Sequence, residues 1–237
     1  MKNIYKLNNN VLFYDDVLNQ EDFELIQAAL YKEPYVTDEW LKNNKWYTGS
    51  AFGNQKKNIP RQSLLKRGWV SDSCRKKLFE SAKAICANPE KLYSSIMMND
   101  NDPLKKLVNE IRDISLKNPD FIGVEGKDWD GLYLLPYKWE NNTRLIWHND
   151  SLNYVGAFAY YCHNDWKDDW GGQLLVKGSN NAGVYIDPIP NRLSLIKKGA
   201  MHTVLPITSN RPRYSISGFF FKWSDSLALK ILEWARN

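Results

Sequence analysis

The sequence predicts a single α+β domain, with helices in its first half and an antiparallel β barrel or sandwich in its second half. Three of the four predicted helices begin before residue 117, and the fourth is a short helix at the end of the chain. From Trp129 onward, eight short apolar or alternating runs are separated by turn residues, which is typical of an antiparallel sandwich or barrel. No linker rich in Gly, Pro or Ser and no internal repeat divides the 237 residues, so we expect one domain over residues 1–237.

The N-terminal part is predicted to be one strand followed by helices. The apolar stretch 10–18 predicts a strand and a turn, and Asn19 then suits the N-cap of a helix. Phe23, Ile26 and Leu30 recur at helical spacing and give this helix an apolar face. Polar residues 32–72 predict long loops with short strands. Further helices are predicted over residues 73–87, over residues 103–116 with Asp102 as the N-cap, and over residues 226–235.

The second half is predicted to contain eight strands. The last two runs are predicted to form a hairpin, because the loop 208–212 between them is rich in turn residues. The runs are Gly131–Tyr137, Arg144–His148, Tyr154–Cys162, Gly172–Val176, Ala182–Ile186, Arg192–Ile196, His202–Ile207 and Arg213–Trp223.

Composition excludes collagen, coiled coils and wholesale disorder. With 43% apolar and 25% charged residues the chain resembles an ordinary globular protein. No apolar run approaches the ~20 residues that cross a bilayer, and no secretory signal is visible, so we expect no membrane partner and a cytoplasmic location. Cys74, Cys86 and Cys162 lack CxxC spacing, which argues against a disulfide framework or a zinc–thiolate site.

Positive charge is concentrated in one segment. The net charge is +5, but residues 54–83 hold nine basic residues against Asp72 and Glu80. Such a segment can attract a nucleic acid or an acidic substrate, although a solvated surface is the commoner explanation.

Two of the three histidines have spacing that suits a metal site. His148 and Asp150 stand at i and i+2, where side chains of a strand share one face, and His202 begins another apolar run. Two imidazoles and one carboxylate form the facial triad of non-haem Fe(II) oxygenases, which leaves coordination positions open. The alternative is that this short pattern arose by chance and binds no metal.

A basic residue follows the second histidine at a suggestive position. Arg213, Ser215 and Ser217 alternate along one predicted strand and therefore share a face. An inward-facing Arg is costly unless it meets an anion, and Arg beside a Ser hydroxyl can hold a carboxylate. The alternative is an ordinary surface arginine, as is expected for Arg211.

These residues together resemble the Fe(II)/2-oxoglutarate-dependent dioxygenases, specifically their prolyl-4-hydroxylase-like branch. The family pattern is HxD, about fifty residues, H, ten residues, then basic-x-Ser. Tyr160–Trp166 with Gly171–Leu174 is similar to its "YLN-x-W…GGxL" strand pair, and residues 202–207 and 215–220 are similar to "HxVxPV" and "SxSGWF". The resemblance implies a double-stranded β-helix core (jelly-roll, cupin-like) at about residues 129–223, with N-terminal helices packed on it.

The resemblance also implies roles for individual residues. His148, Asp150 and His202 would hold Fe(II), and Arg213 with Ser215 would bind the distal carboxylate of 2-oxoglutarate. Tyr137 corresponds to a family tyrosine that contacts this co-substrate, with Tyr133 as the alternative. O2 is the second co-substrate and ascorbate a candidate reductant. His163 is interpreted as a loop histidine.

The expected activity is hydroxylation of an unactivated C–H bond. Asp150 favours hydroxylation over halogenation, because halogenating relatives replace this carboxylate with a small residue. The expected substrate is a prolyl residue in a peptide or protein, and the alternative is a free amino acid or small metabolite. Residues 32–128, with Trp40, Trp46, Tyr47 and Trp69, are a candidate substrate lid.

Two further functions are weighed and disfavoured. A nucleic-acid demethylase would be expected to carry R-x-N-x-T-x-R at the co-substrate arginine, and this chain has Arg-Tyr-Ser-Ile-Ser from Arg213. A non-catalytic β-barrel binding module would be expected to lose a ligand or the arginine, and all are present. The oligomeric state is not predicted.

Overall fold

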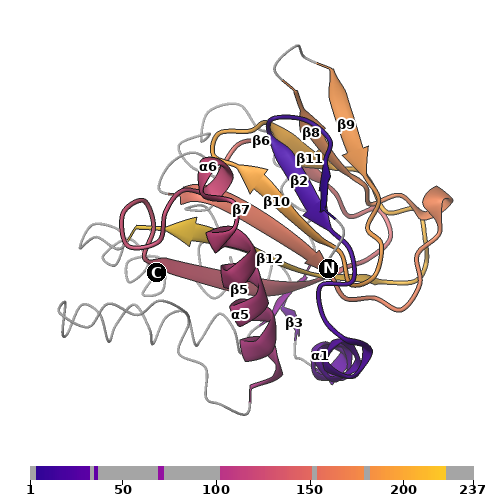
Figure 1. Ribbon diagram of the computed structural model, residues 1–237. Coiled ribbons are helices and arrows are strands. Elements are labelled where there is room, and N and C mark those ends of the chain that lie inside the picture. Colours follow the sequence, from indigo (N-terminus) through magenta and orange to yellow (C-terminus); the bar gives the residue numbers. More distant parts are fainter. Residues whose placement is uncertain are drawn as a thin grey trace.

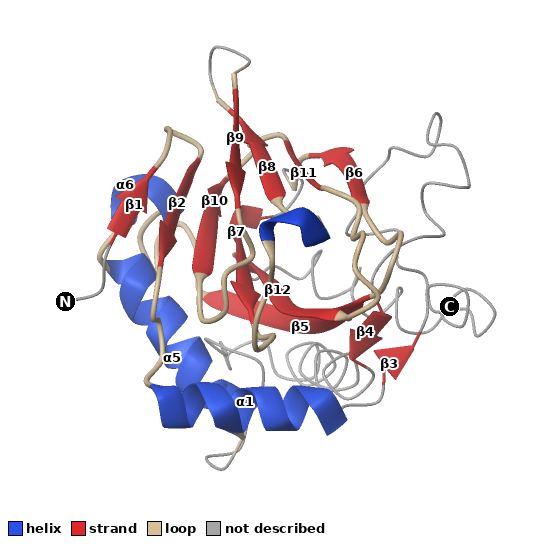
Figure 2. Ribbon diagram, turned by 90° about the vertical axis from the view of Figure 1, so that its right-hand side faces the viewer, coloured by secondary structure: helices blue, strands red, loops and turns tan. Residues whose placement is uncertain are grey.

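The computed structural model describes residues 4–32, 35–36, 69–71, 102–150, 154–178 and 182–222. Within them, two antiparallel sheets face each other, and helices cover the outer side of the larger sheet (Figures 1 and 2). This confirms the predicted α+β fold with a double-stranded β-helix core. The predicted helices over residues 73–87 and 226–235, and most of the predicted lid, lie outside the described residues.

The larger sheet has eight strands, in the order β1-β2-β10-β7-β12-β5-β4-β3. Its long central strands are β5, β7 and β12, and the N-terminal strands complete one edge. The strands are β1 (Ile4–Lys6), β2 (Val11–Tyr14), β3 (Tyr35–Val36), β4 (Trp69–Ser71), β5 (Gly131–Trp139), β7 (Tyr154–Tyr161), β10 (Leu193–Lys197) and β12 (Arg213–Phe221).

The smaller sheet has four strands, in the order β6-β11-β8-β9. They are β6 (Leu145–His148), β8 (Leu174–Lys177), β9 (Gly183–Ile186) and β11 (His202–Val204). All eight predicted runs of the second half therefore contain strands, although most end one to three residues from the predicted bounds.

The predicted hairpin between the last two runs is wrong. β11 pairs with β6 and β8 in the smaller sheet, whereas β12 pairs with β5 and β7 in the larger one. The turn residues at 208–212 are present, but the chain uses them to cross from one sheet to the other. Turn chemistry permits a reversal of direction without fixing which strand becomes the hydrogen-bonded neighbour.

Each face of the larger sheet has its own core. The outer face packs Leu134, Phe158 and Ile216 against the helices. The inner face meets the smaller sheet, where Ile196 packs with Val176 among other small apolar side chains. Because alternate residues of a strand point to opposite faces, β7 and β12 contribute to both cores, with Ala157 and Phe219 on the inner side.

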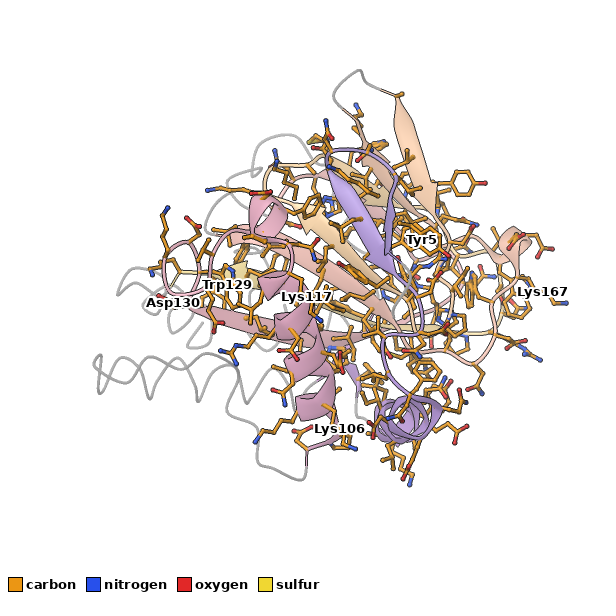
Figure 3. The ribbon with its side chains drawn as sticks, in the orientation of Figure 1. Tyr5, Lys106, Lys117, Trp129, Asp130 and Lys167 are labelled. Carbon is orange, nitrogen blue, oxygen red and sulfur yellow. The ribbon has the colours of Figure 1, made fainter. Side chains whose placement is uncertain are left out.

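Two helices form the outer layer. In α1 (Gln20–Lys32), Asn19 caps the N-terminus as predicted, with its side chain accepting from the Asp22 N–H at 2.9 Å. In α5 (Pro103–Leu116), Asp102 accepts from the Leu104 N–H at 3.0 Å, again as predicted. The helices lie side by side, and Lys106 of α5 (Figure 3) pairs with Asp22 of α1.

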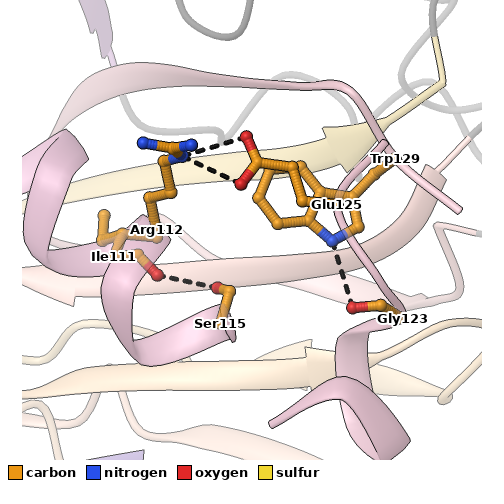
Figure 4. Close-up of polar contacts among 6 residues, drawn as sticks. All are labelled: Ile111, Arg112, Ser115, Gly123, Glu125 and Trp129. Carbon is orange, nitrogen blue, oxygen red and sulfur yellow. Dashed lines mark hydrogen bonds and ion pairs between the residues drawn. The ribbon is translucent and has the colours of Figure 1, made fainter. Parts of the chain in front are cut away.

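The chain between α5 and β5 is fixed by polar contacts (Figure 4). A short helix that the sequence did not predict, α6 (Pro119–Ile122), follows α5. Arg112 then pairs with Glu125 at 2.9 Å, and the indole of the fully buried Trp129 donates to the Gly123 carbonyl at 3.2 Å. These contacts set the position at which β5 enters the sheet.

β2, near the N-terminus, is held in place by contacts with a distant part of the chain. β2 pairs with β10, and Asp15 makes a two-contact ion pair with Arg192 at 2.5 and 2.9 Å. The Asn191 side chain hydrogen-bonds to both the backbone N–H and the backbone carbonyl of Leu18, and it accepts from the Tyr160 hydroxyl.

No helix among the described residues is long and apolar enough to span a membrane.

Candidate metal centre

Three residues from the smaller sheet and its flanking loop converge. His148 ends β6 and lies directly opposite His202, which begins β11. Asp150 lies two residues beyond β6, so the chain turns its carboxylate back toward both rings. The Asp150 oxygens lie 3.7 Å from Nε2 of His148 and 3.2 Å from Nε2 of His202. All three ligand atoms lie within 4.8 Å of one another.

The two histidines are oriented by equivalent backbone bonds. Nδ1 of His148 faces the Ile146 carbonyl at 2.7 Å, and Nδ1 of His202 faces the Ala200 carbonyl at 2.9 Å. A carbonyl oxygen only accepts, so each Nδ1 carries a hydrogen, and the neutral ring then has its lone pair on Nε2. Both lone pairs face the Asp150 carboxylate, as in ligating histidines held by an outer hydrogen bond.

The environment of this cluster favours a cation. Both rings are only 5% exposed. Burial alone would lower the pKa of His202, but the hydrogen bond and charge of Asp150 outweigh it, and the net pKa is raised. The carboxylate therefore attracts positive charge to Nε2. Two neutral imidazoles and a carboxylate fit a divalent first-row metal, with open positions for further ligands.

On the facing sheet, Arg213 forms a buried cationic site. It begins β12, is 1% exposed and donates from Nη1 to the Gly172 carbonyl. Within the described part of the chain no carboxylate pairs with it, and its buried Nε has no hydrogen-bond partner. Burial lowers the pKa of Arg213 to about 10, so the guanidinium stays charged at neutral pH. A buried charge of this kind fits an anionic ligand.

Two glycines shape the turn beside this guanidinium. Gly171 and Gly172, just before β8, have φ values of +71° and +74°. A Cβ on Gly172 would lie 3.2 Å from Nη1 of Arg213, and a Cβ on Gly171 would lie 2.0 Å from the Pro206 carbonyl oxygen. Side chains at either position would therefore displace the chain that contacts Arg213.

Ser215 and its neighbours surround the cationic site. Ser215 is 1% exposed, and its Oγ accepts from the indole N–H of Trp139 at 2.8 Å. Arg213 lies between two rings, with Cζ 4.9 Å from the centroid of Trp139 and 5.5 Å from that of Tyr161. Arg211, by contrast, is a surface residue that pairs with Asp165, as expected.

The sheet register bears on the choice between the two tyrosines of β5. Tyr137 lies directly opposite Ser215, and its ring centroid is 5.6 Å from that of Trp139. Tyr133 lies opposite Phe219, four residues further along, or about 13 Å at the usual rise of a strand. Tyr137 is therefore the tyrosine of β5 that neighbours the Arg213–Ser215 pair.

Sequence reasoning missed Tyr161. The β7 register places it opposite Ser215 on the other side from Tyr137, and it is fully buried beside Arg213. Burial raises the pKa of this tyrosine, and the charge of Arg213 partly counters the increase. Alternation along β7 placed Tyr161 on one face with Ala157 and Ala159. Alternation does not show which neighbouring strand Tyr161 would contact, because that depends on the order of the strands in the sheet.

His163 lies in the loop after β7, as predicted, and the structure shows that it is buried. Its Nε2 faces the Pro188 carbonyl at 2.5 Å, and Nδ1 faces the Tyr214 carbonyl at 3.3 Å. Burial, and then the charge of Arg213, lower the pKa of His163 to about 4, so it is neutral at physiological pH. A neutral ring has one N–H, so only one of these two carbonyls accepts a hydrogen bond from it. It is not part of the His148–Asp150–His202 cluster.

Other predicted functional residues lie outside the described part of the chain. Trp40, Trp46 and Tyr47 are among them, as is all of the basic segment 54–83 except residues 69–71. Trp69 begins β4, which pairs with β5 opposite Lys138. The predicted lid therefore stays a prediction.

A comparison with protein families finds one match. Residues 133–221 match the 2OG-Fe(II) oxygenase superfamily, and this segment includes the three clustered residues, Arg213 and Ser215. No curated protein sequence matches the chain.

Solved structures share the fold at low sequence identity. A 2OG-Fe(II) oxygenase-family oxidoreductase from Burkholderia pseudomallei has a TM-score of 0.52 and 9% identity, covering 90% of this chain and 84% of its own. The α-ketoglutarate-dependent epimerase SnoN of nogalamycin biosynthesis has a TM-score of 0.54 and 11% identity, covering 90% and 78%. A Pseudomonas putida prolyl-4-hydroxylase has a TM-score of 0.46 and 15% identity, covering 63% and 88%.

Proposed function

We propose that this chain, whose core is that of a 2OG-Fe(II) oxygenase, hydroxylates an unactivated C–H bond of a prolyl residue in a peptide or protein. The observation that carries the reaction class is the cluster of His148, Asp150 and His202, with its ligand atoms within 4.8 Å of one another. Fe(II) held there would supply the oxidative decarboxylation of 2-oxoglutarate that drives oxygen insertion into a C–H bond.

The residues of the chain have separate tasks in this proposal. His148 and His202 present Nε2 lone pairs, held in place by their Nδ1–carbonyl bonds, and Asp150 supplies the negative charge. Arg213 and Ser215 bind the distal carboxylate of 2-oxoglutarate. This role is supported by the buried Nε of Arg213, which has no hydrogen-bond partner among the described residues. Tyr137 and Tyr161 lie opposite Ser215 on the two neighbouring strands, and in this proposal they flank the bound carboxylate.

The prolyl substrate is supported by sequence resemblance rather than by the fold. The segments 160–166, 171–174, 202–207 and 215–220 are similar to prolyl-4-hydroxylase-like motifs. The fold itself is shared with an epimerase of nogalamycin biosynthesis, so it does not discriminate between a peptide and a small molecule. A free amino acid or related metabolite is the second candidate. A cytoplasmic location, ascorbate as reductant and the absence of a nucleic-acid substrate also belong to this proposal.

The experiment is a substrate screen with product mass as the readout. The purified chain is incubated with Fe(II), 2-oxoglutarate, O2 and ascorbate, together with proline-containing peptides or free amino acids. We expect a product heavier by one oxygen atom, formed with an equal amount of succinate. The His202→Ala variant is the control and should form neither. Decarboxylation uncoupled from every candidate substrate would overturn both substrate proposals, and no decarboxylation at all would overturn the reaction class.

A further inference from the structure

We propose that Trp139 is a positioning residue for the co-substrate: its indole N–H fixes the Ser215 hydroxyl as a hydrogen-bond donor toward the anion that Arg213 binds. The inference rests on the proposed function, because it concerns how the 2-oxoglutarate carboxylate is held. Trp139 ends β5 and is 4% exposed.

The first step concerns the direction of the Ser215 hydrogen. A serine hydroxyl can donate one hydrogen bond and accept others, so by itself it can turn either way. Here the indole N–H of Trp139 donates to Oγ at 2.8 Å, and an indole nitrogen never accepts. The neighbouring Arg213 has donors only. The hydroxyl hydrogen is therefore directed away from both, toward an acceptor that a bound ligand supplies.

The second step concerns the direction from which that acceptor arrives. The rings of Trp139 and Tyr161 lie 4.9 and 5.5 Å from Cζ of Arg213. Nη1 is already bonded to the Gly172 carbonyl, whereas the buried Nε has no partner within the described residues. A ligand therefore meets the guanidinium at its free edge, where Nε–H and the Ser215 hydroxyl can donate to one carboxylate.

The Trp139 side chain makes two contacts at once, one from its ring to Arg213 and one from its N–H to Ser215. Trp139 lies directly opposite Arg213 in the β5–β12 register, while its indole reaches the next inward residue of β12, Ser215. This diagonal reach sets the ring beside the guanidinium and the N–H on the hydroxyl at once. Phenylalanine at this position would keep a ring near Arg213 but could not donate to Ser215.

The test separates these two contacts by calorimetric titration with 2-oxoglutarate of the Mn(II)-loaded protein under nitrogen. Trp139→Phe should weaken binding about tenfold, the usual effect of losing one buried hydrogen bond in a polar site. Ser215→Ala should weaken it by a similar factor. In the double variant, Trp139→Phe should add no further loss, because the hydroxyl through which it acts is gone.

Two controls distinguish positioning from general damage. Trp147→Phe makes the same change on β6, at a tryptophan that is 39% exposed, and should leave the affinity unchanged. Binding of 2-oxobutyrate, a keto acid without a distal carboxylate, should be the same in Trp139→Phe as in the wild type. Thermal melting of each variant verifies that it is folded.

The possible outcomes distinguish failure of this inference from failure of the proposed function. Equal 2-oxoglutarate affinity in wild type and Trp139→Phe overturns the inference, as does a full additional loss from Trp139→Phe in the Ser215→Ala background. No 2-oxoglutarate binding by the wild type overturns the proposed function instead.

Discussion

Replacing Arg213 with methionine should stabilise the ligand-free protein and at the same time weaken 2-oxoglutarate binding. Burial lowers the pKa of Arg213 from its ordinary 12.5 to about 10, and no carboxylate of the described residues pairs with it. Both the folded and the unfolded chain carry the proton at pH 7, so the whole shift counts against the folded state. At about 1.4 kcal/mol per pKa unit, this is a penalty of about 3 kcal/mol.

Methionine removes this penalty but introduces a smaller one. The bond from Nη1 to the Gly172 carbonyl is lost, and an unpaired buried carbonyl costs about 1–2 kcal/mol. We therefore expect the free energy of unfolding to rise by about 1–2 kcal/mol, as is often found when a buried charge is replaced by an apolar side chain. The lost charge-assisted bond to the carboxylate is worth about 1.5–3 kcal/mol, or roughly 10- to 150-fold in affinity.

Urea denaturation of the metal-free protein and calorimetric titration of the Mn(II)-loaded protein measure the two effects. Arg211→Met is the matched control, because the Arg211 side chain is 68% exposed and its ion pair with Asp165 lies at the surface, so both quantities should stay close to wild-type values. The reasoning is refuted if Arg213→Met lowers the free energy of unfolding or binds 2-oxoglutarate as tightly as the wild type.

Three further predictions concern other parts of the site. Asp150→Ala and His202→Ala should each abolish Mn(II) binding by calorimetry and succinate formation in the assay, and substantial turnover by either would contradict the triad. His163→Asn should flatten the dependence of stability on pH. With the pKa of His163 lowered to about 4, the unfolded chain takes up the proton first as pH falls below about 6.5. Wild-type stability should therefore fall by about 3 kcal/mol from this group between pH 6.5 and 4, as urea titrations at several pH values would show. Gly171→Ala should lower the melting temperature strongly, because its Cβ would lie 2.0 Å from the Pro206 carbonyl oxygen, and a normal melting temperature would count against the geometry of this turn.

Local features of the fold were predictable from the sequence. The helices at 20–32 and 103–116 begin at Asn19 and Asp102, whose side chains cap them as predicted. Both signals depend on neighbours within four residues. The helix at 119–122 was missed because four residues are too short for helical periodicity.

Strand partners were not predictable in the same way. β11 and β12 are consecutive in the chain but belong to different sheets, so the turn at 208–212 gave the wrong neighbour for β12. The same limit explains why Tyr161 was missed, since its place beside Arg213 depends on β7 and β12 being adjacent. The three clustered residues could be predicted from spacing because the chemistry of metal ligation restricts their types.

The pairing of β2 with β10 has a consequence for how the protein is made. The four residues of β2 are all buried, yet their partner strand ends at Lys197, late in the chain. A ribosome that adds 5–20 residues per second needs roughly 10 to 40 seconds to travel from one to the other. During that interval the edge of β2 that pairs with β10 has no partner in the nascent chain, although α1 can already cover Leu12 and Tyr14. Completion of this edge is therefore a late step of synthesis, and the growing polypeptide should depend on chaperones that shield its first residues.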